Sequence, residues 1–554
     1  MMGRNFETVV PRESVVAVVP RQLISAAIAF LQPASSAKCV EKLSLSAWLF
    51  LTSVFWAVVR SSFIVKSVSG ETLDQTIPLW IRVAFFAAFA IPSIFFFAFR
   101  KDRFWLLGLG SVVGLMPELP LIPYIRDNGH LLVILSAIAA LLYGMMFPLE
   151  KAPGFARTYA LYVTVCAAST IINFLLYQNV WQLKVGISFL IFFTALAVMI
   201  SGVSRAGNSR WSTVEGLVEG LSWGAIGQCA IAIVSLPLLF ILPFEDGADT
   251  VFGLAFYDRY KSTMPGPVNL GMFFVAAMPL VLLWMSWGNS KIRACLGWVY
   301  LQMAPWLVGM TGSRTARIVL IGLVLAFLLK PKTRLSALII LPSIAISFYL
   351  SFYFESFPAA VRSALGDASA ATLSLKGNFF YMSDRSGLIE AAVEALPVFG
   401  RNALSLAKSL HSSEAGASFY IPPLAPMLPA SVLEALNLFF GYGAGVGGYV
   451  RSGYPSPHTT ILNLLIDTGV FGLISCVTFF VWLALRLFVR SFSRAHPHAI
   501  TIWLCLLCYG AASVANGTYV PQWWGYYSVI LVLAAAAAAN SLTEGSAERQ
   551  SRDV

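Results

Sequence analysis

The stretch that decides the fold runs from residue 458 to residue 487 and reads HTTILNLLIDTGVFGLISCVTFFVWLALRL. Asp467 is its only acidic residue, and Arg486 is its last residue but one. About 20 consecutive apolar residues are enough for a helix to cross the hydrocarbon core of a bilayer. The stretch therefore predicts a transmembrane helix, with a histidine, His458, at its first position.

Apolar runs of this kind recur along the whole chain of 554 residues. Hydrophobic residues make up 58% of the sequence, charged residues only 11%, and the mean hydropathy is +0.77. A soluble domain carries about 25% charged residues. The runs do not alternate as the strands of a membrane barrel do. The composition predicts an all-α polytopic membrane protein.

The runs predict about fourteen transmembrane helices. We place them at residues 45–65, 79–99, 104–125, 130–149, 157–177, 184–202, 218–242, 268–287, 293–310, 315–330, 334–354, 458–487, 497–515 and 521–539. The chain then divides into an N-terminal cytoplasmic or interfacial segment (1–44), helices 1–11 (45–354), a large outward loop (355–457), helices 12–14 (458–540) and a polar cytoplasmic tail (541–554). An unusual signal peptide is the alternative for the first 40 residues.

Basic connectors set the orientation. The segments RKDR (100–103), EKAPGFAR (150–157), SRAGNSR (204–210), NSKIR (289–293), KPKTR (330–334) and RLFVRSFSRAH (486–496) alternate with less basic connectors. The positive-inside rule places the basic set, and with it both termini, in the cytoplasm. The same rule explains the net charge of +11 without nucleic-acid binding.

The outward loop at 355–457 is long enough to have a function of its own. Its stretch SDRSGLIEAAVEALPVFG (383–400) has the apolar spacing of an amphipathic helix, which we expect to lie on the membrane face. The stretch FFGYGAGVGGYV (439–450) is glycine-rich, but it lacks the lysine of a phosphate-binding loop and follows no strand. A hinge or a close-packing loop is the better interpretation.

Three arginines on the outward side point to an anionic partner. Arg314 and Arg317 are three residues apart, so they share a face at the start of the helix at 315–330, and Arg385 precedes the amphipathic loop helix. Snorkelling is the alternative explanation for the first two residues. Such a partner could be a lipid diphosphate. The arginines would stabilise the negative charge that develops on the diphosphate when it departs as the leaving group.

His458 supplies a candidate general base on the same side, because an imidazole with a pKa near about 6.5 is largely neutral at neutral pH. A helix-capping histidine is the alternative. Asp467 lies nine residues further on and so on the opposite helix face, which favours a structural bond to a neighbouring helix. No group of residues has metal-ligand spacing, and the arginines could carry the charge, so we expect neither metal nor cofactor.

Together, TGSRTAR (311–317), the loop stretch and SPHTTILNLLIDTGVFGL (456–473) resemble the O-antigen ligase/polymerase superfamily over residues 255–475. The matching positions are Ser313, Arg314, Arg385, Pro397, Gly400, His458, Asp467 and Gly469, together with Asn269 in MPGPVNLGMFFVAAMPL (264–280). Thr459 departs from the asparagine that usually follows the histidine, and the loop after Gly400 is extended.

The resemblance implies a membrane-embedded glycosyltransferase fold of the GT-C type with a periplasmic loop. It also implies an inverting, metal-independent transfer of a glycan from undecaprenyl diphosphate at the bacterial inner membrane. Arg314, Arg385 and, less directly, Arg317 would bind the diphosphate, and His458 would be the base. Asn269, Ser313, Asp467 and Gly469 would support the site.

Four functions fit these features to different degrees. We favour a polysaccharide polymerase that joins lipid-linked repeat units, acts as a monomer and works beside a chain-length regulator. A ligase to lipid A–core and a protein-directed oligosaccharide transferase differ from it only in the acceptor. A transporter or flippase would show internal repeats and polar groups at mid-bilayer, and the sequence shows neither clearly.

Overall fold

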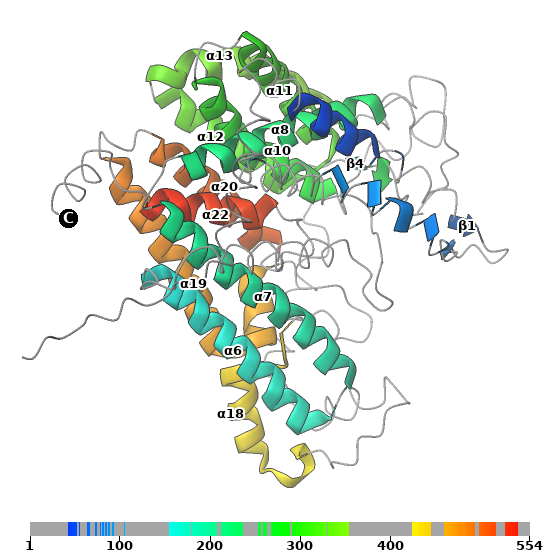
Figure 1. Cartoon of the computed structure of the whole chain (residues 1–554), viewed down its shortest axis with the longest axis vertical. Coiled ribbons are helices and arrows are strands. Elements are labelled where there is room, and N and C mark those ends of the chain that lie inside the picture. Colours follow the sequence, from blue (N-terminus) through cyan, green and yellow to red (C-terminus); the bar gives the residue numbers. More distant parts are fainter. Residues whose placement is uncertain are drawn as a thin grey trace, which may run out of the picture.

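The computed structural model describes residues 42–52, 154–178, 180–207, 212–235, 267–287, 291–329, 331–353, 424–444, 459–492, 498–516 and 527–540, and shorter pieces between residues 55 and 105 and at 253–255 and 259–262. This part of the chain is predominantly helical (Figure 1). Its elements are α6 (Gly154–Tyr177), α7 (Val180–Gly207), α8 (Ser212–Ser235), α10 (Pro267–Met285), α11 (Lys291–Met310), α12 (Arg314–Leu329), α13 (Pro331–Tyr353), the 3₁₀ turn η2 (Ala425–Met427), α18 (Ala430–Phe440), α19 (Thr460–Ser491), α20 (Ala499–Asn516) and α22 (Tyr527–Asn540).

Four of these helices contain apolar segments long enough to cross a membrane. The segments are Ala156–Tyr177 in α6, Thr213–Val234 in α8, Val268–Met285 in α10 and Thr460–Ser491 in α19. Ten of the helices expected from the sequence overlap described helices, from α6 to α22. The helical class and the membrane-spanning character therefore agree with the structure. The full count of fourteen and the periplasmic loop stay predictions.

Short strands correct the sequence prediction in two places. The helix expected at 45–65 does not reach its predicted end, because β1 (Ile64–Lys66) pairs antiparallel with β2 (Thr72–Asp74). The β-branched side chains of Ile64 and Val65 favour extended backbone. A second antiparallel pair, β3 (Gly253–Ala255) and β4 (Arg259–Ser262), lies in a predicted loop. These two short hairpins are additions to a helical fold and leave its class unchanged.

Helix α10 forms the centre of the upper bundle in Figure 1 and packs against α8, α11, α12 and α20. Its side chains from Leu270 to Leu283 are buried almost without interruption, as expected for a helix that is apolar all round. The hydroxyl of Tyr300 in α11 donates to the carbonyl of Phe274, at 2.8 Å. Such contacts fix α11, and with it the start of α12, relative to the core.

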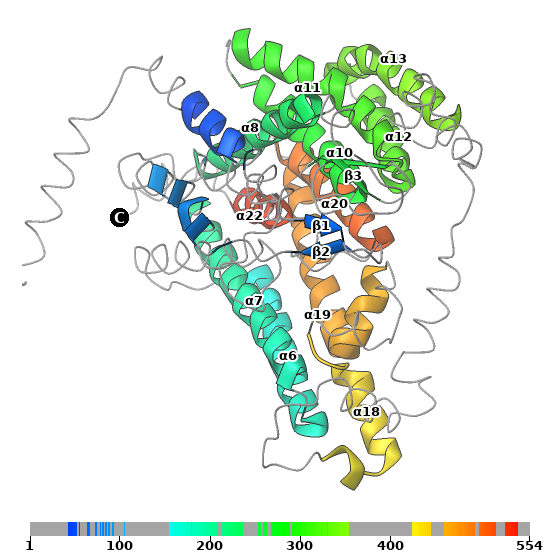
Figure 2. The same ribbon diagram turned by 90° about the vertical axis from the view of Figure 1, so that its right-hand side faces the viewer.

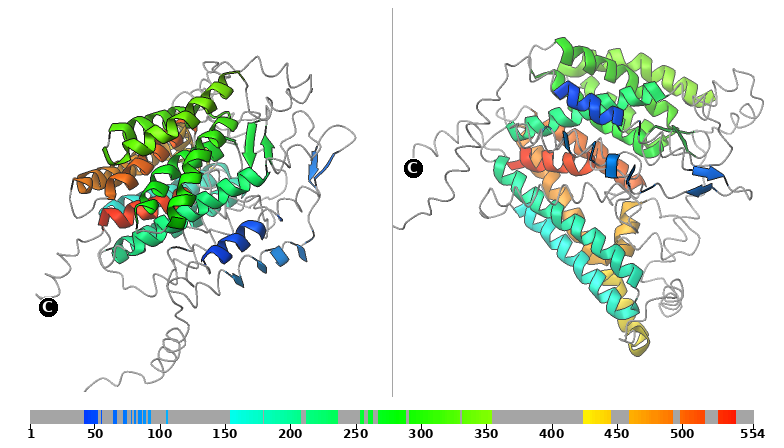
Figure 3. Two further views of the ribbon diagram at one scale, coloured as in Figure 1. Left: turned by 90° about the horizontal axis from the view of Figure 1, so that it is seen from above. Right: turned by 45° about the vertical axis from the view of Figure 1, so that its right-hand side comes forward.

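The helices α6, α7, α18 and α19 extend away from this bundle (Figures 1 and 2). Helices α6 and α7 pack side by side, α19 packs against α6, and α22 connects the group to the bundle through contacts with α7 and α8. The views in Figure 3 show α6 and α7 running together along most of their length. The protein therefore has a compact bundle and a longer helical arm.

Basic residues of the predicted cytoplasmic connectors cap helix ends. Arg486 and Arg490 of α19 donate to the carbonyls of Ala539 and Ala538 at the end of α22, at 3.0 and 3.3 Å. Arg334 donates to the carbonyl of Leu328 at the end of α12. Cations near a helix C-terminus are stabilising because the last carbonyls lack partners within the helix.

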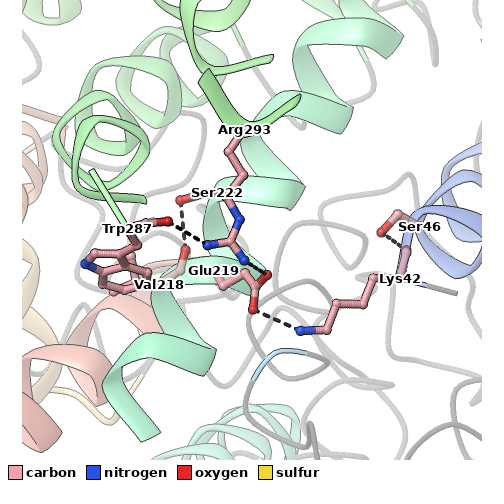
Figure 4. A network of polar contacts seen from close by, with 7 residues as sticks. All are labelled: Lys42, Ser46, Val218, Glu219, Ser222, Trp287 and Arg293. Carbon is pink, nitrogen blue, oxygen red and sulfur yellow. Dashed lines mark hydrogen bonds and ion pairs between the residues drawn. The ribbon is translucent and has the colours of Figure 1, made fainter. Parts of the chain in front are cut away.

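An ion-pair network joins α8, α11 and the helical residues 42–52 (Figure 4). The sequence predicts that all three charged residues lie at the cytoplasmic side. Glu219 of α8 accepts from Lys42 at 2.9 Å and from Arg293 of α11 at 3.2 Å. Arg293 also donates to the carbonyl of Trp287 and lies over the ring of Trp284. The three charged residues come from segments that the charge pattern assigns to, or next to, the cytoplasm, so the packing agrees with that pattern.

Candidate functional site

The start of α12 is a preformed turn between two helices. Gly312 has a φ of 60°, a left-handed conformation that favours glycine. The hydroxyl oxygen of Ser313 accepts from the amide of Ala316 at 3.3 Å, so Ser313 caps the helix. Thr311 accepts from the amide of Ser313 and donates to the carbonyl of Val308. The sequence TGSR thus builds a fixed helix N-terminus, which is a site that favours anions.

The two arginines of this turn have different environments. Arg314 is half-buried in the first turn of α12. Arg317 is only 5% exposed, and its guanidinium donates to the carbonyl of Gly309 at 3.1 Å. Arg317 therefore ties α12 to the last turn of α11, whereas Arg314 is the more accessible cation.

The first turn of α10 lies against the same turn. A Cβ atom on Gly271 would stand 2.8 Å from the hydroxyl oxygen of Thr311 and 3.0 Å from Cβ of Ala316. Only glycine permits this approach without a shift. Asn269, two residues earlier, is half-buried. The structure thus brings the helix entry that contains Asn269 next to the turn that contains Ser313.

Asp467 and Gly469 lie elsewhere, at a break in α19. Gly469 has φ 66° and ψ −165°, a conformation that is almost exclusive to glycine. The break frees two carbonyls from the helix. The amide of Tyr442 donates to the carbonyl of Ile466 at 2.7 Å, and that of Gly443 donates to the carbonyl of Asp467 at 2.9 Å.

The turn after α18 packs directly against the backbone at this break. Gly441 has φ 70° and ψ −159°. A Cβ atom on Gly441 would stand 2.5 Å from the carbonyl carbon of Asp467, and one on Gly469 would overlap the main chain of Phe439 and Phe440. The two glycines let the backbones of α18 and α19 touch directly. The sequence predicts a hinge or close-packing loop at 439–450. Phe439 and Phe440 instead end α18, Gly441 packs closely, and residues 445–450 lie outside the described residues.

Polar side chains on one face of α6 form hydrogen bonds to the place where α18 and α19 touch. Ser169 donates to the carbonyl of Asp467 at 2.9 Å, and the side-chain amide of Asn173 donates to the carbonyl of Gly441 at 2.9 Å. The amide of Asn437 donates to the hydroxyl of Tyr177 at 2.8 Å. All are buried. We name Ser169, Asn173, Asn437, Gly441 and Gly469 the α6–α18–α19 junction.

Sequence reasoning missed most of this junction, although a signal was present. Ser169, Asn173 and Tyr177 follow one another at intervals of four, so they form a polar stripe on one face of an apolar helix. A polar stripe in a spanning helix indicates a partner, because polar groups in hydrocarbon are costly when they are unpaired. The bond from Ser169 is to the main-chain carbonyl of Asp467, so the structural role expected for its carboxylate stays a prediction.

His458 and Arg385 lie outside the described residues, as do Pro397, Gly400 and the predicted amphipathic helix. The residues next to His458 are described. The hydroxyl of Thr459 accepts from the amide of Leu462 and caps α19. The hydroxyl of Thr460 donates to the carbonyl of Ser513 in the last turn of α20. Helix α20 also packs against α10 and α12, so one helix packs against all three helices that carry the described candidate residues.

Comparison with known proteins gives no independent guide to the site. No family model and no curated protein matches this chain.

Replacing Arg317 by glutamine is expected to lower stability more than the same change at Arg314. A hydrogen bond to a charged group contributes about 1.5–3 kcal/mol, and Arg317 is the buried member of the pair. Thermal midpoints of the two purified variants in one detergent measure the difference. Equal midpoints would show that the bond to Gly309 does not stabilise the fold.

Proposed function

We propose that this protein is a polysaccharide polymerase of the bacterial inner membrane. It transfers a glycan from undecaprenyl diphosphate to a sugar hydroxyl of another lipid-linked repeat unit on the periplasmic face. The observation that carries the proposal is the capped start of α12, where the half-buried Arg314 stands at a fixed helix N-terminus. A helix N-terminus and a guanidinium both stabilise phosphate oxygens.

The reaction needs a leaving group and a base. The hydroxyl oxygen of the acceptor bonds to the anomeric carbon from the face opposite the diphosphate, and the bond from that carbon to the diphosphate oxygen breaks. Arg314, with Arg385 as a second cation, would stabilise the negative charge on the departing undecaprenyl diphosphate. His458 would take the proton of the hydroxyl. No cofactor takes part in this scheme, because the donor is already activated.

Arg317, to which the resemblance also gives a diphosphate-binding role, has a supporting part in this scheme because its guanidinium is buried and donates to Gly309. Its bond to Gly309 fixes the turn that presents Arg314. Ser313 caps the same turn, and Gly271 in α10 packs closely against it. Arg314 would thus bind the diphosphate, and Arg317 would position the turn that carries Arg314.

The direct test is the glycan profile of cells that lack this gene, with carrier-linked intermediates resolved from surface polymer. A polymerase predicts single repeat units on the carrier and no long chains. Long chains that accumulate on the carrier and are absent from lipid A would instead indicate a ligase. Normal surface polymer would reject both transferase functions. Intermediates retained on the cytoplasmic leaflet would indicate a flippase.

Replacing Arg314 by lysine is expected to reduce polymer strongly at unchanged protein level. Lysine keeps the charge but loses the planar fork that binds two phosphate oxygens at once. Polymer length and amount from complemented cells measure the effect, with protein abundance as the control for folding. Full activity of the lysine variant would argue against bidentate binding by Arg314.

A further inference from the structure

Helix α18 is anchored to the end of α6, although it lies in the segment that the sequence predicts as a periplasmic loop. The amide of Leu424 donates to the carbonyl of Leu175 at 3.3 Å, and Asn437 pairs with Tyr177. Leu433 and Asn437 are almost completely buried. Figure 2 shows α18 at the free end of the helical arm. One face of α18 therefore packs against the rest of the protein.

The other face of α18 is apolar and exposed. Val432 and Phe439 are seven residues apart, so they share a helix face, and they are 42% and 41% exposed. Leu424 and Met427 just before the helix are exposed as well. Glu434 is the only charged residue of α18. We name Val432 and Phe439 the α18 patch.

The α18 patch continues onto a helix that is able to span the membrane. The ring of Phe439 stacks on that of Phe471 in α19, with centroids 5.1 Å apart and an interplanar angle of 23°. Phe471 is itself 44% exposed, and Ile474, about one turn further on, is more exposed still. The exposed apolar side of α19 and the α18 patch thus form one surface.

Two independent measures place this surface at the edge of the hydrocarbon core. Phe471 lies fifteen residues before Arg486 in α19, which is about 22 Å at about 1.5 Å per residue. The core is about 30 Å thick, so with Arg486 near one boundary Phe471 lies inside the opposite one. The spanning segment of α6 ends at Tyr177, the partner of Asn437. Both measures put the C-terminal half of α18 at that boundary.

We propose that α18 is an interfacial helix whose patch contacts the acyl chains of the leaflet opposite Arg486 and Arg490. In the predicted orientation this is the periplasmic leaflet. The part of residues 355–457 that contains α18 would then be a membrane-bound element rather than a water-exposed loop. A stable protein partner usually covers about 800 Å² on each side. A small patch that continues the exposed apolar side of a spanning helix fits lipid better. The proposal does not depend on glycosyl transfer.

Photo-crosslinking in proteoliposomes of phosphatidylethanolamine and phosphatidylglycerol tests the proposal. p-Benzoylphenylalanine is placed at Phe439 or, in a second variant, at Val432. The matched control is the same probe at Glu434, which is exposed on a different side of the same helix. We expect phospholipid adducts at 439 and 432, detected by mass spectrometry, with a yield several-fold above that at 434.

Each other result overturns the proposal. Equal and low lipid yields at all three positions would show that the patch faces water. Crosslinks between two copies of the chain would show that a second copy covers it. The variant at Val432 separates a misfolded Phe439 variant from a true negative, because position 432 is farther from the Phe471 stack.

Discussion

Cells that carry His458→Ala in place of the native chain are expected to make no surface polymer while they keep a normal amount of the protein. General base catalysis contributes about 10²–10⁴-fold to a rate, so loss of the only base in the proposed scheme would leave too little product to detect. The readout is polymer on the cell surface together with carrier-linked repeat units, which should accumulate.

A neighbouring substitution provides the control. Thr459 caps α19 through the amide of Leu462, and loss of a cap costs about 1 kcal/mol. Thr459→Ala should therefore lower the thermal midpoint slightly and leave polymer in place. Near-normal polymer from His458→Ala would remove the catalytic role of the histidine, whatever the control shows.

The ten expected helices that overlap α6 to α22 were predicted from the sequence because their cause is local. A run of about 20 apolar residues has few alternatives to a spanning or buried helix, and the runs behind α10 and α12 appear within a few residues of their expected bounds. The sequence also predicted the start of α12, whereas the left-handed turn at Gly312 and the cap at Ser313 come from the structure.

The junction of α6, α18 and α19 was not predicted because its cause is distant in sequence. Gly469 fits the break only because Gly441, from another helix, lies against it. The prediction took the stretch at 458–487 as one uninterrupted helix, and the non-helical backbone of Gly469 corrects this. The different environments of Arg314 and Arg317 could not be predicted for a similar reason. Arg317 is held by the carbonyl of Gly309, which belongs to another helix, α11.

Gly469→Ala is expected to reduce the folded yield and thermal stability markedly. A residue with a side chain in this region of positive φ costs about 1–3 kcal/mol, and the added Cβ would also overlap the main chain of Phe439 and Phe440. Backbone cannot move aside as a flexible side chain can, so α18 would have to separate from α19. The measurements are the thermal midpoint and the fraction of monodisperse protein in detergent.

Gly510→Ala is the matched control, because Gly510 lies in α20 and a Cβ atom there meets nothing within 4 Å. Alanine is favoured over glycine in a helix by about 1 kcal/mol, so this variant should be neutral or more stable. Gly441→Ala should resemble Gly469→Ala. The double variant should cost less than the two together, because both break one contact. Strict additivity, or a Gly469→Ala midpoint equal to that of Gly510→Ala, would contradict the interlocked backbone.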